Sequence, residues 1–182
     1  MTNQGDTYRI PDGSLWLVEQ APDDNPDGAV VFRITVPAKF VTPPPHRHPY
    51  ATDSWEVLRG SLSIQVEGRW QTLKQGERAD VPPGTIHTVA NRSGAEVIVR
   101  NIHGPANHFD TFAAHVDRLM RARNVTSAKD PRAAILISML ILEYPNTLIP
   151  GRPRDRIITN LLASIGRLFG MNTLLPAMEG KP

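Results

Sequence analysis

The sequence lacks cysteine entirely, although the chain has 182 residues. A disulfide bond, a thiolate metal ligand and a cysteine nucleophile are therefore excluded. The first ten residues, MTNQGDTYRI, also lack the apolar core of a secretory signal. Both observations fit a reducing compartment, and we expect a cytoplasmic protein.

Long apolar runs are missing as well. The nearest candidate, AAILISMLIL at residues 133–142, is about half as long as the roughly 18 residues that a membrane span needs. An excess of charge of one sign is also absent, because the net charge is only +2. The chain shows no basic patch and no motif for nucleic acid, so we expect a small-molecule partner and no nucleic acid.

Short runs rich in large apolar residues, separated by turn signals, occupy the chain up to about residue 104. In SLSIQVEG, residues 61–68, the apolar residues Leu62, Ile64 and Val66 alternate with polar ones. This period of two predicts a strand with one buried face. Many short strands at close spacing indicate a β-sandwich or barrel. Similar runs occur at residues 14–20, 29–36 and 96–102.

After residue 104 the pattern becomes helical. The apolar residues recur at spacings of three and four, which is typical of amphipathic helices. A proline marks the start of the second helix and Gly170 marks the end of the third. We therefore predict a β-domain over residues 1–104 and a helical extension over residues 105–182, with helices at 109–120, 131–144 and 154–169.

The third predicted helix has a broad apolar face that must be buried somewhere. We expect this face to pack on the barrel wall, in the narrowest form as a lid, or to form the interface of a homodimer. Four arginines border it, so contact with an anionic membrane surface stays open as an alternative. The face consists of Ile157, Ile158, Leu161, Leu162, Ile165, Leu168 and Phe169.

The stretch PPPHRHPYATDSWEVLRG, residues 43–60, carries the first candidate site. His46 and His48 lie two positions apart, so a strand points both side chains to the same side. Two imidazoles and a nearby carboxylate, here Asp53, form a mixed nitrogen and oxygen site that suits a first-row metal ion. The three prolines hold the approach extended, which preorganises such a site.

A second stretch, GERADVPPGTIHTVAN, runs from residue 76 to residue 91. Its PPG sequence predicts a sharp turn, because proline presets φ and glycine tolerates a positive φ. The turn delivers His87 to the start of the following strand. Asn91 then follows at the end of that strand, where we expect it to serve a turn.

Together, the two stretches resemble the two motifs of the cupin superfamily. The second motif, G-x5-P-x-G-x2-H-x3-N, is matched at every position, from Gly76 to Asn91. The first, G-x5-H-x-H-x3–4-E-x6-G, is matched at its two histidines and its final glycine. Phe40 stands at its leading glycine and Asp53 at its glutamate. The resemblance covers residues 10–103 and implies an all-β jelly-roll barrel (double-stranded β-helix) with appended C-terminal α-helices.

In cupins the motif histidines and the glutamate converge on a metal inside the barrel. The resemblance therefore implies His46, His48, Asp53 and His87 as ligands of a divalent ion, which is Fe, Mn, Ni or Zn. Aspartate is one methylene shorter than glutamate. It either coordinates directly, binds through a water, or leaves a three-histidine site with an open position.

Other polar residues near the motifs receive weaker predictions. Trp55 shares the face of Asp53 in a regular strand, so it either contacts the substrate or packs in the core. Glu56 is a possible ligand by type, but its register points it to the opposite side. We expect three further histidines to be structural or solvated, namely His103, His108 and His115.

The residues and the resemblance together predict a metal-binding cupin. We expect a metal-dependent enzyme that acts on a small organic molecule, of the oxygenase, isomerase or cyclase type, because the fold itself does not choose among these reactions. A non-catalytic cupin that binds or senses a small ligand is the second hypothesis. A module that docks on a partner or a membrane through its C-terminal helices is the third.

Overall fold

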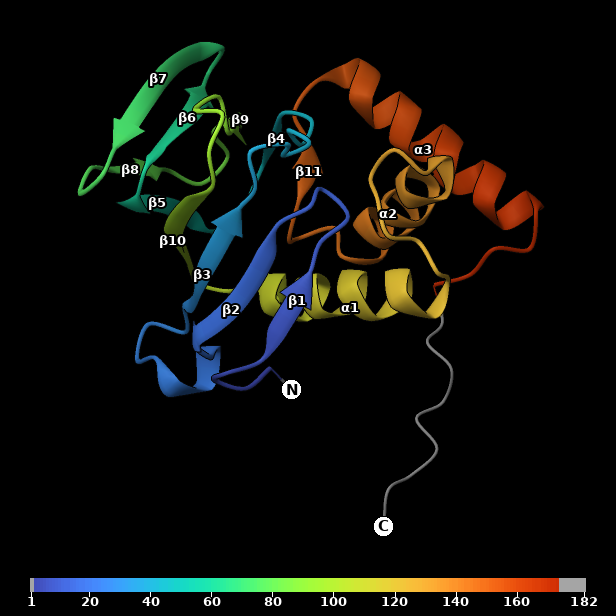
Figure 1. Ribbon diagram of the computed structural model, residues 1–182. Helices are drawn as coiled ribbons and strands as arrows, with labels where there is room; N and C mark the ends of the chain where they lie inside the picture. Colours follow the sequence, from blue (N-terminus) through green and yellow to red (C-terminus); the bar gives the residue numbers. More distant parts are fainter. Residues whose placement is uncertain (1, 174–182) are drawn as a thin grey trace.

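The strands of the protein form two antiparallel sheets in the computed structural model, which describes residues 2–173. The first sheet has the order β1 (Thr7–Arg9), β2 (Leu15–Gln20), β3 (Val30–Val36), β10 (Val97–Gly104), β5 (Thr52–Arg59) and β8 (Arg78–Val81). The second has the order β11 (Ile149–Pro150), β4 (His46–Arg47), β9 (His87–Ala90), β6 (Ser61–Val66) and β7 (Arg69–Lys74). A short 3₁₀ helix, η1 (Pro22–Asp24), joins β2 to β3. The two sheets form a jelly roll (Figure 1).

The inward face of the first sheet is set by strict alternation along β10. Its odd-numbered residues are buried and its even-numbered residues are partly exposed. The inward residues begin with Val97 and Val99 and end with Asn101 and His103. The apolar inward residues at the start of β10 pack in the core. The polar inward residues at its end lie beside the histidines described below.

The second sheet contributes its own apolar residues to the same core. Leu62 and Ile64 of β6 are fully buried, as their alternation with polar residues predicts. β6 pairs with β7 on one side and with β9 on the other. Through this pairing, β9 lies between the core strand β6 and the short strand β4.

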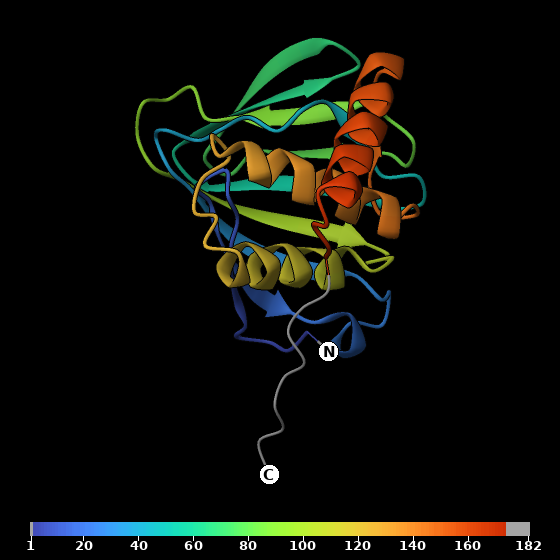
Figure 2. The same ribbon diagram turned by 90° about the vertical axis from the view of Figure 1, so that its right-hand side faces the viewer.

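Three helices follow the barrel strands: α1 (Phe109–Ala122), α2 (Pro131–Glu143) and α3 (Pro153–Leu168). Asp130 caps α2, since its carboxylate accepts a hydrogen bond from the backbone N–H of Arg132 at 2.9 Å. The sheets occupy the left part of Figure 1 and the helices lie to their right and below, with α3 at the outer edge. Figure 2 looks onto α3 from the outside. The predicted helices are therefore present at nearly the predicted bounds.

The inner side of α3 carries small residues and its outer side carries large ones. Thr159, Ala163 and Gly166 are buried, and a Cβ at Gly166 would lie only 2.6 Å from the Sδ atom of Met139 in α2. The large apolar residues are exposed instead, so the expectation that this face covers the barrel wall is wrong. Its exposed members are Ile157, Ile158, Leu161, Leu168 and Phe169.

The segment after α2 returns to the barrel. β11 pairs with β4 through Pro150 opposite His46, and the backbone N–H of Gly151 donates to the carbonyl of Pro45 at 2.8 Å. Thus a strand from the C-terminal part completes the edge of the second sheet.

The division into a barrel of residues 1–104 and an extension of residues 105–182 stays a prediction. Within residues 2–173, no helix is long and apolar enough to cross a membrane.

Candidate metal centre

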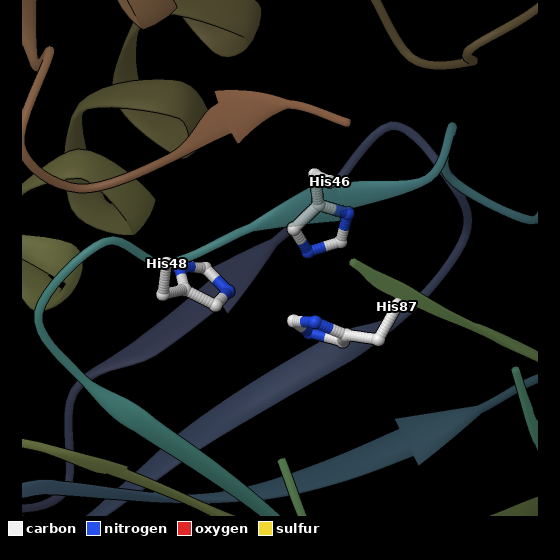
Figure 3. Close-up of side chains that lie close together, drawn as sticks. All are labelled: His46, His48 and His87. Carbon is white, nitrogen blue, oxygen red and sulfur yellow. The ribbon is translucent and has the colours of Figure 1, made fainter. Parts of the chain in front are cut away.

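Three histidines converge at one end of the second sheet. His46 in β4 lies opposite His87 in β9 in the strand register, and His48 follows β4 directly. One ligand nitrogen from each ring lies within 4.8 Å of the others. The three rings face a common space in Figure 3. The strand geometry predicted from the two motifs thus brings these three residues together.

Each of the three rings is held through its Nδ1 atom by a backbone carbonyl. His46 Nδ1 lies 2.9 Å from the carbonyl oxygen of Pro44, and His87 Nδ1 lies 3.0 Å from that of Thr85. His48 Nδ1 lies 2.7 Å from the carbonyl oxygen of Thr147. A carbonyl can only accept, so each Nδ1 carries the proton and donates it. Nε2 is then the remaining ligand atom of each ring, which is the usual arrangement of a metal-binding histidine.

The PPG turn supports this arrangement as the sequence predicts. Gly84 has φ of +77°, a conformation that glycine adopts without strain. Its backbone N–H donates to the carbonyl of His48 at 2.8 Å. The turn of the second motif is therefore bonded to the histidine strand of the first. Asn91 bridges backbone carbonyls, including that of Ala95 at 2.7 Å, which agrees with a turn role.

Asp53 lies next to His87 and is almost fully buried. Its Oδ2 atom accepts hydrogen bonds from Trp55 Nε1 at 2.6 Å and from His87 Nε2 at 2.9 Å. Its Oδ1 atom accepts one from Asn101 Nδ2 at 2.7 Å. The carboxylate is not among the three-histidine group, but it forms a second group with His48 and His103. Direct coordination by Asp53 stays a prediction.

The pKa values of the site follow from burial and from these contacts. Burial, followed by repulsion from His87, lowers the pKa of His46 to about 4. Burial likewise lowers the pKa of His48 well below its usual value. Both rings are therefore neutral near pH 7 and their Nε2 atoms are free to bind a cation.

His87 and Asp53 behave differently because they form an ion pair. Burial alone would lower the pKa of His87, but the hydrogen bond and the charge of Asp53 outweigh it and raise that pKa. Burial alone would raise the pKa of Asp53, but His103, His87 and His48 hold it well below its usual range. Both ring nitrogens of His87 face oxygen acceptors, so below its raised pKa the ring carries two protons and a positive charge.

The remaining predicted residues have clear places. Trp55 is 8% exposed and packs in the hydrophobic core. Its indole N–H holds Asp53, and contact with a substrate stays a prediction. Glu56 lies on the other side of β5, where it accepts a hydrogen bond from Arg100 at 3.0 Å. His115 is bonded at both ring nitrogens, outside the site.

His103, which the sequence led us to expect to be structural or solvated, lies in a group of possible metal ligands with His48 and Asp53. It lies opposite Asp53 in the register of β5 and β10 and is fully buried at the site. A signal was present, because His103 and Asn101 are polar residues at inward positions of an otherwise apolar strand. The motifs did not include β10, and therefore gave no reason to place its end beside Asp53.

Two hollows in the described surface are lined by neither the three motif histidines nor Asp53. One, of about 500 Å³, lies over β2, β3 and β10 and is lined in part by Leu17, Glu19 and Arg100. The other, of about 300 Å³, is lined in part by Pro22 and Asn107.

Comparison with known proteins agrees with the two motifs. Residues 32–114 match the family model described as "Cupin domain". Residues 32–114 therefore form a cupin domain, as the two motifs predict. The matched range contains all of the histidines of the site, so the sequence resemblance is confirmed.

Individual proteins are similar to parts of this chain. A stretch of 57 residues is 42% identical to Oxidoreductase macE of Penicillium terrestre, and it makes up 30% of this chain and only 22% of the relative. KdgF from Halomonas sp. is similar over 55% of this chain and 87% of its own, with 18% identity and a TM-score of 0.46. A predicted oxalate decarboxylase from Thermotoga maritima is similar over 50% and 79%, with 14% identity and a TM-score of 0.47. Structural likeness at this level carries no argument about activity.

Proposed function

We propose that this cupin is a metal-dependent enzyme acting on a small organic molecule. The proposal rests on the convergence of one ring nitrogen each from His46, His48 and His87 within 4.8 Å. A backbone carbonyl fixes each ring at its Nδ1 atom, which leaves Nε2 as the ligand atom. Such second contacts orient histidine ligands and set their tautomer in metal sites. Asp53 supplies the negative charge beside them.

The donor set fits a divalent first-row ion. Imidazole nitrogen suits Fe, Ni and Zn, and a carboxylate adds affinity for Mn. A bound ion would supply a Lewis acid that polarises a substrate oxygen, or a centre for dioxygen chemistry. His46 is the most exposed of the three ligands, so substrate reaches the site from the β4 side. Identity of the ion among Fe, Mn, Ni and Zn stays open.

The reaction class has one further support. The relative from Penicillium terrestre carries the name oxidoreductase, although the matched stretch is a small part of that protein. This supports an oxygenase or other oxidoreductase more than an isomerase or a cyclase.

The Trp55 side chain would act through Asp53, because its hydrogen bond fixes the orientation of the Asp53 carboxylate. A cytoplasmic location remains our expectation.

The homodimer is proposed on the exposed face of α3. Five large apolar side chains on one helix form a patch of the kind that marks an interaction site. A second copy of the chain would cover this patch with an identical one, as two-fold interfaces do. Contact of the same face with an anionic membrane is the alternative, and binding of the protein to anionic vesicles tests it.

Metal content tests the proposal. The protein is made without a tag, without chelating resin and without EDTA, and is analysed by elemental mass spectrometry beside two variants. We expect about one equivalent of metal in the parent and in the control His108→Ala, whose histidine is exposed and belongs to neither group of possible ligands. We expect less than about a tenth of an equivalent in His48→Ala. Equal metal in all three proteins would refute the proposed centre.

A second assay separates the enzyme from a ligand-binding cupin. The metal-loaded parent and His48→Ala are incubated with a pooled small-molecule extract in air, and the mixture is analysed by mass spectrometry. Metal-dependent conversion of a compound supports the enzyme. A compound that is retained unchanged by the parent supports the sensing or binding alternative.

A further inference from the structure

His103 occupies a position in the site that neither motif accounts for. It is the last inward residue of β10, and its Cα partner across the strand pair is Asp53. The side chain is completely buried. Phe109 of α1 stacks on one face of the ring, with centroids 4.2 Å apart and planes inclined by 19°. The ring is thus fixed in orientation by packing and not by hydrogen bonds.

Both ring nitrogens of His103 are without a hydrogen-bond partner among residues 2–173. Buried polar atoms in native proteins are nearly always paired, and an exception calls for an explanation such as an ion. An apolar side chain of the same shape would fill this place without the unpaired atoms. The long approach of Nδ1 to Asp53 Oδ1 at 3.5 Å accounts for one nitrogen only, and Nε2 stays without a partner among the described residues.

The surroundings of His103 supply the explanation. One ligand atom each from His48, Asp53 and His103 lie within 4.8 Å of one another, and all three residues are buried. His103 Nδ1 lies 3.5 Å from Asp53 Oδ1, and the rings of His48 and His103 are 4.3 Å apart between centroids. This group shares His48 with the three-histidine group, and it adds the carboxylate that the first group lacks.

We propose that His103 is an additional nitrogen ligand of the metal centre, acting with His48 and Asp53 on the inner side of the site. The inference rests on the proposed function, since it needs an ion at the motif histidines. Together with His46 and His87, this group forms a mixed nitrogen and oxygen donor set that suits a divalent first-row ion.

The substitution that tests this inference is His103→Phe. Phenylalanine keeps a planar ring against Phe109 and removes both unpaired nitrogens, while Asp53 keeps its bonds to Trp55, His87 and Asn101. We expect the metal-free variant to melt at the same temperature as the parent or higher. His103→Leu is the second variant, for use if the larger ring is not accommodated.

The measurement is the dissociation constant of Fe(II), determined under argon by competition with a chromogenic chelator. We expect His103→Phe to raise it by about 10- to 100-fold. The visible spectrum of bound Co(II) should change in the same variant, because one nitrogen donor is lost. His115→Phe is the matched control, since His115 is a partly buried histidine outside the site, and it should leave both readouts unchanged.

The outcomes are distinguishable. If the parent binds no metal, the proposed function fails and this inference fails with it. If the parent binds metal and His103→Phe or His103→Leu binds it equally well with the same Co(II) spectrum, the inference alone is overturned. Weaker binding together with undiminished stability of the metal-free variant supports His103 as a ligand.

Discussion

Binding of a metal ion at the three histidines should release a proton from His87. In the metal-free protein both nitrogens of this ring face oxygen acceptors, Thr85 and Asp53. His87 is then charged, and Asp53 raises its pKa. A nitrogen that binds a metal cannot keep its proton, so ion and proton compete for the same Nε2 atom.

The number of protons released follows from the protonation state of each histidine ring. At pH 6 we expect about one proton released per ion, all of it from His87. His46, with a pKa of about 4, is only about 1% protonated at that pH and adds nothing. Near pH 4 this ring is half protonated, so the release should rise by about half a proton. Between about pH 5, where His46 is mostly neutral, and the pKa of His87, affinity should rise about tenfold for each pH unit.

The assay is isothermal titration with Mn(II) at pH 6 in two buffers of different ionisation enthalpy. The difference between the two apparent enthalpies gives the number of protons released. Mn(II) is preferred to Zn(II), because water bound to zinc in proteins ionises near pH 7 and adds its own proton.

A matched variant ties the proton to His87. Asp53→Asn removes the charge that raises the pKa of His87, so the release at pH 6 should fall clearly below that of the parent. If the parent binds Mn(II) at pH 6 without releasing a proton, then either His87 is neutral in the metal-free protein or it is not a ligand. Either finding would refute the reasoning.

Four further predictions concern the supports of the site and the exposed helix. Gly151→Ala should lower the free energy of unfolding by about 1–3 kcal/mol and weaken metal binding, because a Cβ would lie 2.9 Å from the carbonyl oxygen of Pro45. Gly166→Ala should lose comparable stability in chemical denaturation but keep its metal affinity, and a parallel loss of affinity would contradict the account. Trp55→Phe should cost about 1–3 kcal/mol in urea unfolding, because it deprives a buried carboxylate of a donor, and an unchanged midpoint would count against that bond. Leu161→Glu should convert a dimeric parent to a monomer in sedimentation; a parent that sediments as a monomer and binds anionic vesicles would favour the membrane alternative instead.

Local sequence patterns were sufficient for the histidine pair and the turn. The positions of His46 and His48 depend on the period of a strand and on the prolines before it, and that of His87 depends on the PPG turn. These are short-range effects, so motif spacing alone predicts them. The three C-terminal helices follow in the same way from apolar periodicity, a proline start and a glycine stop.

Contacts between distant segments could not be predicted. Thr147, 99 residues after His48, accepts the bond that fixes its ring, and nothing in the local sequence marks Thr147 for that role. His103 reaches Asp53 only because β10 pairs with β5 in one particular register. The outward face of α3 was also misjudged, since the helix packs on α2 through its small residues and not through its large ones.

The central claim is that the motif histidines hold a metal ion, and a crystal of the protein grown with its native metal tests it most directly. Anomalous difference maps would be recorded above and below the absorption edge of that metal. We predict one peak that disappears below the edge, about 2.0–2.3 Å from the Nε2 atoms of His46, His48 and His87. A peak elsewhere, or a well-ordered site without a peak in metal-loaded crystals, would contradict the account.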